Sequence, residues 1–492
     1  MPSETTSPSP ARTPTAAPVG ASRRPGPAPR DTPRYGIRAA WMMLASGWSA
    51  NQFSALLGAY RSELGLTDSA VTGLFAVYVV GLIPGLLVAG PLADRRGRRR
   101  IALAALGVNL LSTVLLTLGT TATGWLLPGR FLTGVSAGVL LAAGSAWIKE
   151  LSSPPYVAPG APASTASRRA GLFVSAGFAS GGLAAALIAR WAPHPMVTAY
   201  IPHVLLAAGA LLAARSAPET RTVAVRRGLC PPVPPCGTTA HSGERVGAAS
   251  GERVGAASGG RVGAVGGEWG GAASGERVGA VGGEWGGAAS GGKVGGGART
   301  AVGGKGGDPV RQLRRAVFPL APWVFAAPTV GFVTLPGLVH AGLVFTGIAT
   351  AVVPGTGLLV QPLARRAAAH RHAAASIGLL AIASGLALAA WAAHTASQPW
   401  AMTAAVTLGA GYGFTLTHGL TQVAATAPPH QLARLTSYFW TAAYTGMFTP
   451  YAITLLTDNG PLTPPQTLTA AAALAAVTCV THLRVRPGTI TP

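Results

Sequence analysis

The feature of this sequence that most limits its fold is a succession of twelve mostly apolar segments. Each is about 20 residues long, the length a helix needs to cross the hydrocarbon core of a bilayer. The first six cover residues 38–60, 70–90, 101–119, 125–148, 170–189 and 197–214. The second six cover residues 317–335, 342–363, 376–393, 400–424, 435–456 and 466–482. We therefore predict an all-α membrane protein with twelve transmembrane helices in two six-helix halves.

The composition agrees with lipid as the solvent. Charged residues make up 10% of the chain and hydrophobic residues 49%, whereas a soluble domain carries about 25% charged residues. The net charge of +23 comes from basic residues spread in short clusters between apolar segments, with no nucleic-acid recognition module among them. We expect the bilayer as a partner and no nucleic acid. The three cysteines form no metal-binding pair, so neither a metal nor a cofactor is expected.

The positions of the basic residues predict the orientation. Segments 38–60 and 170–189 are each followed by a single arginine, Arg61 and Arg190. If the segments are numbered 1 to 12 in chain order, most other basic residues near them follow an even-numbered segment. These residues are Arg95, Arg96, Arg98, Arg99, Arg100, Lys149, Arg168, Arg169, Arg365, Arg366, Arg371, Arg434, Arg484 and Arg486. Because short cytoplasmic loops are enriched in Lys and Arg, we expect these loops and both termini to face the cytoplasm of a bacterial inner membrane.

Composition also predicts the domain boundaries. Residues 1–36 form a polar, Pro-rich tail, residues 37–216 the first half, residues 316–484 the second half and residues 485–492 a short tail. Residues 217–315 contain an eight-residue repeat, GERVGAAS and variants, that begins at Gly243. Ordering so many glycines is entropically costly, so we expect a disordered cytoplasmic linker. Its Trp269 and Trp285 leave a docking role open.

The most specific motif is GPLADRRGRRR at residues 90–100, between the second and third segments. Gly90 permits close approach of a neighbouring helix, Gly97 permits a tight turn, and Asp94 is the one acid in a basic loop. The motif resembles the signature loop of the major facilitator superfamily, Gly-x-Leu-Ala-Asp-Arg-x-Gly-Arg-Arg. The residues that match are Gly90, Leu92, Ala93, Asp94, Arg95, Gly97, Arg98 and Arg99.

This resemblance implies a gating role. In the family the loop aspartate lies near the cytoplasmic start of the eleventh helix and holds the outward-facing state shut on the cytoplasmic side. An acid at the end of the fourth helix pairs in some members with a loop arginine, which here predicts a cluster of Asp94, Arg98 and Glu150. The equivalent stretch of the second half, QPLARR at residues 361–366, lacks the aspartate and the glycine. Such halves rock about a binding site at the middle of the membrane.

Two further stretches resemble the same family. Residues 129–138, GRFLTGVSAG, match the fourth-helix motif, in which Arg130 is either a functional residue inside the membrane or a side chain that reaches to the outer interface. Residues 177–195 match a fifth-helix motif of exporters, with Gly181-Gly182 where that motif has Gly-Pro. The glycines still predict close helix packing.

Polar and aromatic residues within the segments are the candidates for a substrate cavity, and each has an interhelical hydrogen bond as its alternative role. His418 and Gln422 are four residues apart and so share a helix face. Tyr438 and Tyr444, with Trp440 between them, are candidates for an aromatic wall. The full set of candidates is Trp48, Asn51, Gln52, Arg130, His418, Gln422, Tyr438 and Tyr444.

We predict a secondary active transporter that works by alternating access and exports amphipathic drugs or metabolites. An importer or uniporter is the alternative within the same class, and a non-transporting membrane scaffold is the alternative of another class. An enzyme is disfavoured because no clustered acids or activated nucleophile occur. No acid lies at the centre of a segment, so any coupled proton would be carried by Asp94, Glu150, His203 or His418. A monomer is expected.

Overall fold

The computed structural model describes residues 34–153, 155–157, 164–220, 317–368, 370, 373–427, 432–458 and 460–484. The predicted linker repeat, the C-terminal tail and nearly all of the predicted N-terminal tail lie outside these residues.

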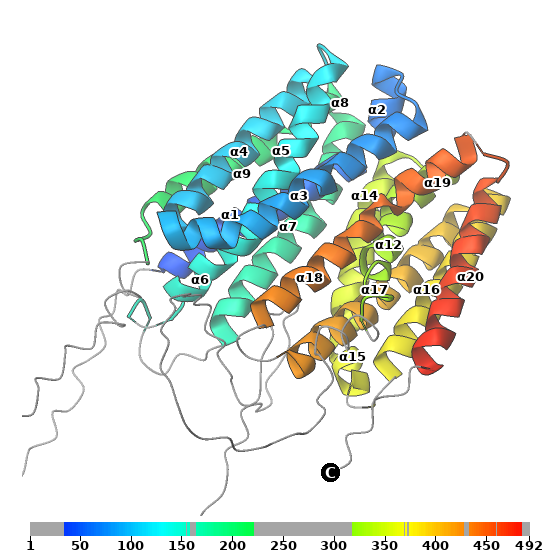
Figure 1. Ribbon diagram of the computed structural model, residues 1–492. Coiled ribbons are helices and arrows are strands. Elements are labelled where there is room, and N and C mark those ends of the chain that lie inside the picture. Colours follow the sequence, from blue (N-terminus) through cyan, green and yellow to red (C-terminus); the bar gives the residue numbers. More distant parts are fainter. Residues whose placement is uncertain are drawn as a thin grey trace, which may run out of the picture. The chain divides into compact units, whose positions relative to one another are not determined.

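The first half consists of six helical segments, which Figure 1 draws in blue to green. Some are single helices and others are broken by a short turn of different helical geometry. In chain order they are α1 (Tyr35–Ala55) with α2 (Leu57–Leu64), α3 (Asp68–Arg96), α4 (Arg98–Leu118), η1 (Thr123–Trp125) with α5 (Leu126–Val139), η2 (Leu140–Gly144) and α6 (Ser145–Leu151), α7 (Ser164–Trp191), and α8 (Pro195–Thr198) with α9 (Ile201–Arg215).

The second half repeats this plan with six more segments (Figure 1). In chain order they are α12 (Trp323–Thr329) with η3 (Val330–Thr334) and α13 (Leu335–Leu338), α14 (Leu343–Leu359) with α15 (Gln361–Ala368), α16 (Ala373–Thr395), α17 (Gln398–Thr426), α18 (Leu432–Tyr444) with η4 (Thr445–Phe448) and α19 (Thr449–Asp458), and α20 (Pro464–Arg484).

Among the described residues, eight helices are long and apolar enough to cross a membrane, and Trp323–Leu338 is a shorter apolar helix. The remaining three segments are α1–α2, α17 and α18–α19, which carry more Ser, Thr, Asn, Gln and Tyr. Many of their polar side chains are buried by neighbouring helices. The prediction of twelve transmembrane helices in two six-helix halves is therefore confirmed.

The seventh segment begins later than the sequence predicts. Residues 317–322 form turns, and α12 begins only at Trp323, directly after Pro322. Proline removes a backbone donor and fits best at the start of a helix, which explains the delay. Downstream, Pro328 lies inside α12 and is followed by the π-helical turn Val330–Thr334. A π-turn widens the helix locally, so this segment is not one continuous α-helix.

Glycines bring α7 into close contact with α1 and with the second half. A methyl group at Gly181 would lie 2.6 Å from the Trp48 Cα, and one at Gly177 would meet the backbone of α1 as well. Gly182 faces the side chain of Thr350 on α14. The glycines of residues 177–182 thus permit close backbone approach within the first half and contact across the two halves.

Two hydrogen bonds between described residues join the halves, and both lie away from the Arg-rich end of α3. The Thr72 hydroxyl, near the start of α3, donates to the Thr454 hydroxyl of α19 over 3.2 Å. The Asn51 amide, near the end of α1, donates to the Thr350 carbonyl of α14 over 3.4 Å. We call these two contacts the outer seal, because the sequence predicts that the Arg-rich end of α3 faces the cytoplasm.

Candidate functional site

The turn between α3 and α4 depends on Gly97. This residue ends α3 and begins α4 with φ of 97°, a backbone conformation that side chains rarely adopt. A methyl group at Gly97 would also lie 2.5 Å from a carboxylate oxygen of Glu219. Both the conformation and the available space therefore require glycine at this position.

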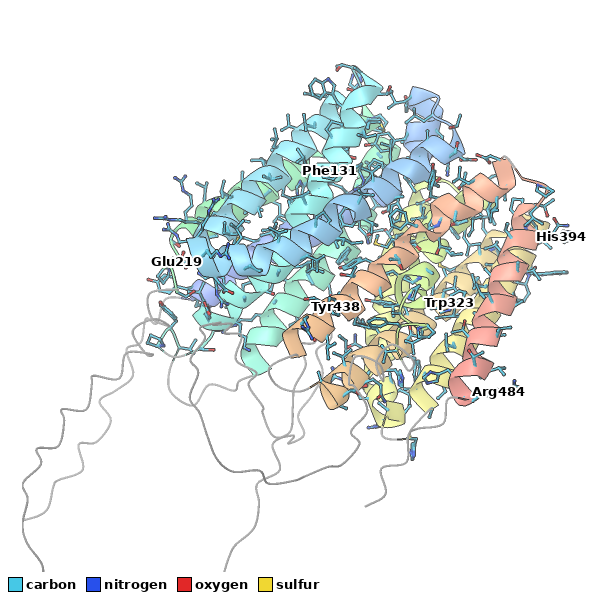
Figure 2. The ribbon with its side chains drawn as sticks, in the orientation of Figure 1. Phe131, Glu219, Trp323, His394, Tyr438 and Arg484 are labelled. Carbon is cyan, nitrogen blue, oxygen red and sulfur yellow. The ribbon has the colours of Figure 1, made fainter. Side chains whose placement is uncertain are left out.

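Glu219 caps the start of α4 (Figure 2). Its carboxylate accepts hydrogen bonds from the backbone N–H groups of Arg98 at 3.0 Å and Arg99 at 3.1 Å. A negative charge is favourable at a helix N-terminus, where backbone N–H groups lack partners. The short segment after α9 is held further by the Trp147 indole, which donates to the Pro218 carbonyl over 3.0 Å.

Glu219 was not among the residues predicted from the sequence. The sequence nevertheless held a sign of its role. Glu219 is one of only fourteen acids, and it follows the sixth segment at the membrane face predicted for the Arg-rich loop. The position follows from the tertiary structure because the end of the sixth segment must return to the end of the second, more than a hundred residues earlier. Spacing along the chain does not reveal that return.

Arg98 is the centre of the charge cluster that the sequence predicts. Its guanidinium lies 3.0 Å from Glu150 at the end of α6 and 3.5 Å from Asp94 at the end of α3. Glu150 also accepts a hydrogen bond from the Thr220 hydroxyl. The Asp94 side chain is 59% exposed, so its contact with Arg98 is the weaker of the two ion pairs.

Other parts of the signature loop differ from expectation. A methyl group at Gly90 would meet no atom within 4 Å, so the expected close approach of a helix there is absent in this state. The reason is that α3 turns this position away from its neighbours. Arg95 is exposed, whereas Arg99 donates to the Arg215 carbonyl over 2.7 Å. Asp94 forms its described ion pair with Arg98 of the same junction, not with a residue at the start of α18.

Arg130 lies in an aromatic cage inside the first half and does not reach an interface. The side chain is fully buried, and its Nε donates to the Leu74 carbonyl over 3.3 Å. The guanidinium carbon is 4.1 Å from the centre of the Phe53 ring and 5.0 Å from that of Tyr78. Neither terminal nitrogen has a hydrogen-bond partner among the described residues.

The polar candidates of α1 have different environments. The Asn51 amide bonds the Phe178 carbonyl at 3.0 Å in addition to its contact in the outer seal, so it joins helices in this state. Gln52 is fully buried, and neither atom of its amide has a partner among the described residues. The Trp48 indole nitrogen is likewise buried without a partner there.

Aromatic side chains of the second half form one group. Phe325 stacks on Tyr444 with ring centres 4.5 Å apart and an interplanar angle of 11°, and it also contacts Tyr412 and Trp440. Tyr444 and Trp440 were predicted from the sequence, whereas Phe325 and Tyr412 were not. Tyr438 is 42% exposed on α18 (Figure 2). It does not join this group, because residues six positions apart lie on different faces of a helix with 3.6 residues per turn.

A histidine pair connects α17 and α20. The buried ring of His418 meets that of His482 edge to face, with centres 5.4 Å apart. Gln422 lies one turn further along α17 and is half-buried. His203 has a different environment, since its ring nitrogens contact the Thr113 hydroxyl at 2.8 Å and the Ala45 carbonyl at 3.1 Å.

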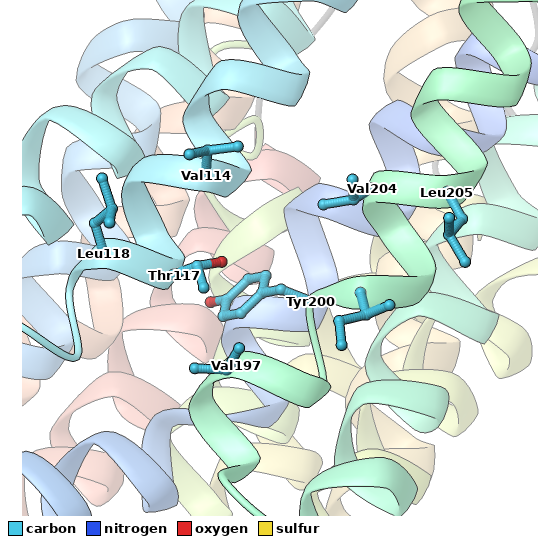
Figure 3. A pocket seen from close by; sticks show the side chains of 8 residues that line it. Val114, Thr117, Leu118, Val197, Tyr200, Val204 and Leu205 are labelled. Carbon is cyan, nitrogen blue, oxygen red and sulfur yellow. The ribbon is translucent and has the colours of Figure 1, made fainter.

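A pocket of about 240 Å³ lies between α4 and α9 (Figure 3). It contains none of the predicted substrate residues and is lined almost entirely by apolar groups: Val114, Thr117, Leu118, Val197, Tyr200, Ile201, Val204 and Leu205. Several of these side chains, Leu205 among them, are exposed on the outside of the first half. In a membrane this pocket would face lipid, so we do not assign the substrate site to it.

Two six-helix halves, with a charged junction at the end of α3 and aromatic groups between the helices, define the fold of a multi-pass membrane transporter. The sequence model of the Major Facilitator Superfamily matches residues 39–449 of this chain, so the chain belongs to this family. Solved structures of low sequence identity share the fold. A POT family transporter in complex with 5-aminolevulinic acid has 12% identity and a TM-score of 0.62 over 92% of this chain and 95% of its own.

The inward open xylose transporter XylE from E. coli has 14% identity and a TM-score of 0.59, over 92% of this chain and 96% of its own. Among curated proteins, the multidrug resistance protein MdtL of Escherichia coli is 34% identical over 77 residues. That match covers 16% of this chain and 19% of MdtL, so it is confined to a small part of both proteins.

Proposed function

We propose that this transporter works by alternating access and exports amphipathic small molecules across the bacterial inner membrane. The observation that carries the proposal is the aromatic group of Phe325, Tyr412, Trp440 and Tyr444 in the second half, of which Tyr444 is buried and the other three are partly buried. Ligand sites for amphipathic molecules are mostly apolar and aromatic, with few polar groups that fix orientation. The partial likeness to MdtL supports export of this substrate class.

The outer seal and the charge cluster support alternating access. The halves are hydrogen-bonded through Thr72–Thr454 and Asn51–Thr350. At the other end of α3, Arg98 holds Asp94 and Glu150 within the first half. We propose that this end faces the cytoplasm, together with both chain termini. When the outer seal opens, the exposed Asp94 becomes available to the start of α18, where a helix N-terminus favours negative charge.

A proton gradient is the candidate driving force. Histidine titrates near neutral pH, and His418 beside His482 offers a proton site shared between two helices. His203 is a weaker candidate because both of its ring nitrogens are within hydrogen-bond distance of protein groups in the first half. A His418→Ala variant tests the assignment, because transport that keeps the wild-type pH profile would eliminate this carrier.

Everted membrane vesicles provide the test of export. Vesicles that contain the full chain are energised with lactate, and uptake of the amphipathic anionic dye 8-anilinonaphthalene-1-sulfonate is followed by fluorescence. We expect the dye to be removed from the vesicle membrane faster than in vesicles without the protein, and nigericin to abolish the difference. Solute uptake in right-side-out vesicles, with no activity in everted ones, would instead identify an importer.

A further inference from the structure

We infer that the transported molecule carries a negatively charged group, such as a carboxylate, that pairs with Arg130 while its apolar body lies against the aromatic groups. This inference rests on the proposed function and narrows its substrate class to amphipathic organic anions. It starts from a charge that the protein buries without neutralising.

The guanidinium of Arg130 has unused binding capacity. A buried charge is costly unless hydrogen bonds and a counterion compensate for the loss of water. Here Nε alone has a hydrogen-bond partner among the described residues, the Leu74 carbonyl, and both terminal nitrogens lack one. The rings of Phe53 and Tyr78 supply cation–π attraction but no hydrogen-bond acceptor in the plane of the guanidinium. Two parallel N–H groups are the arrangement that binds a carboxylate with both oxygens.

No acid of the described residues neutralises Arg130. The ion pairs described in this structure join Arg61 to Asp68 and Arg98 to Asp94 and Glu150, and none of them includes Arg130. The described acids all lie at helix ends or in the short segments between helices: Glu63, Asp68, Asp94, Glu150, Glu219 and Asp458. Arg130, by contrast, lies inside α5. A transported anion would supply the missing negative charge.

The aromatic cage is continuous with the second half. Phe53 and Tyr78 belong to the same buried cluster as Phe332, Tyr444 and Met447. Tyr444 in turn stacks on Phe325. The proposal places the molecule between the halves, with the Arg130 charge and its cage on the side of the first half and aromatic faces on the side of the second. This combination suits an aromatic or amphipathic anion better than a cation, which the Arg130 charge would repel.

Three probes with the same ring system and different charges test the inference. Binding of 1-naphthoate, 1-naphthamide and 1-naphthyltrimethylammonium to the purified full chain in detergent is measured by thermal unfolding and by titration. We expect 1-naphthoate to bind and to raise the unfolding temperature, because a ligand that binds only the folded state stabilises it. Equal or tighter binding of the amide or the ammonium compound would overturn the inference. It would also be overturned if chloride raised the unfolding temperature as much as 1-naphthoate does.

Variants connect the binding to this side chain. Arg130→Gln should weaken 1-naphthoate binding about thirtyfold or more, the loss expected when one partner of a buried charge pair is removed. Arg130→Lys should retain part of the affinity, and Arg190→Gln, which removes an exposed arginine at the end of α7, should leave it unchanged. Without ligand, Arg130→Gln should be at least as heat-stable as the wild type, since it removes an unneutralised charge. Unchanged 1-naphthoate affinity in Arg130→Gln would refute the assignment.

Transport of the same probes separates this inference from the proposed function. Export of the neutral or cationic probe but not of 1-naphthoate would refute the anion site and leave export standing. Binding of 1-naphthoate through Arg130, with no export of any probe, would refute export and leave the anion site standing. The wild-type measurements decide between these outcomes even if a substitution at position 130 prevents folding.

Discussion

The two halves contain equivalent junctions that differ in charge. Residues 90–93 of the first half read Gly-Pro-Leu-Ala, and residues 361–364 of the second read Gln-Pro-Leu-Ala. Ala93 and Ala364 are both buried against their neighbours. The next residue is an acid in the first half, Asp94, and a base in the second, Arg365. The packing of the junction is thus retained in both copies, but the charge is reversed.

We propose that this difference places the gate in the first half. In the first half, Gly97 makes the turn that lets Glu219 cap α4 and places Arg98 beside Glu150. In the second half, Ala368 stands at the position that corresponds to Gly97. A helix junction that only needs to pack can lose the glycine and the acid. We propose that the first junction keeps both because it changes partners during transport.

The largest expected effect comes from Gly97→Ala, which would make the first junction resemble the second. The substitution forces a side chain into a left-handed conformation and against the Glu219 carboxylate, at a cost of about 1–3 kcal/mol. We expect loss of most transport and a lower unfolding temperature in detergent. Gly90→Ala is the matched control, since its added methyl group meets open space. Equal behaviour of the two variants would remove the distinction between the junctions.

Glu219→Ala should have the next largest effect. It removes two hydrogen bonds to the first N–H groups of α4, and loss of a helix cap costs about 1–2 kcal/mol. Glu219→Gln keeps a hydrogen-bond acceptor but loses the negative charge. Its unfolding temperature should therefore lie between those of Glu219→Ala and the wild type. If Ala and Gln were both as stable as the wild type, the cap would make no contribution.

Asp94→Asn should change stability little and transport more. Because Asp94 is exposed, its ion pair with Arg98 is worth only about 0.5 kcal/mol after solvent screening. A gating role nevertheless predicts slower turnover with normal amounts of protein in the membrane. Dye export in everted vesicles, normalised to protein, measures the effect. Wild-type turnover would contradict the proposed change of partners.

The smallest expected effect is that of Arg365→Asp, which gives the second junction the acid of the first. Without the equivalents of Gly97 and Glu219, the new acid should not create a gate, and a surface charge change typically alters stability by less than about 0.5 kcal/mol. Transport and thermal unfolding should both stay near wild type. An effect as large as that of Asp94→Asn would show that the two junctions share the gating function.

The sequence located many of the site residues and predicted one of their pairings, the charge cluster around Arg98. Asp94, Arg98 and Glu150 were expected to meet because a family motif and the Arg-rich loops place them at one membrane face. Glu219, His482, Phe325 and Tyr412 were missed, because each acquires its neighbours from helices distant in the chain. Asn51 and Arg130 were both plain candidates, yet Asn51 joins helices whereas Arg130 retains nitrogens without partners.

The sequence by itself determined how many times the chain crosses the membrane. It also predicted which loops share a face, because hydropathy and Arg content are properties of local stretches. The tertiary structure alone decided which polar groups have a hydrogen-bond or ion-pair partner. A hydrogen bond or ion pair needs two atoms within a few ångströms, and in this fold those atoms come from helices that are brought together by glycine contacts and by the outer seal.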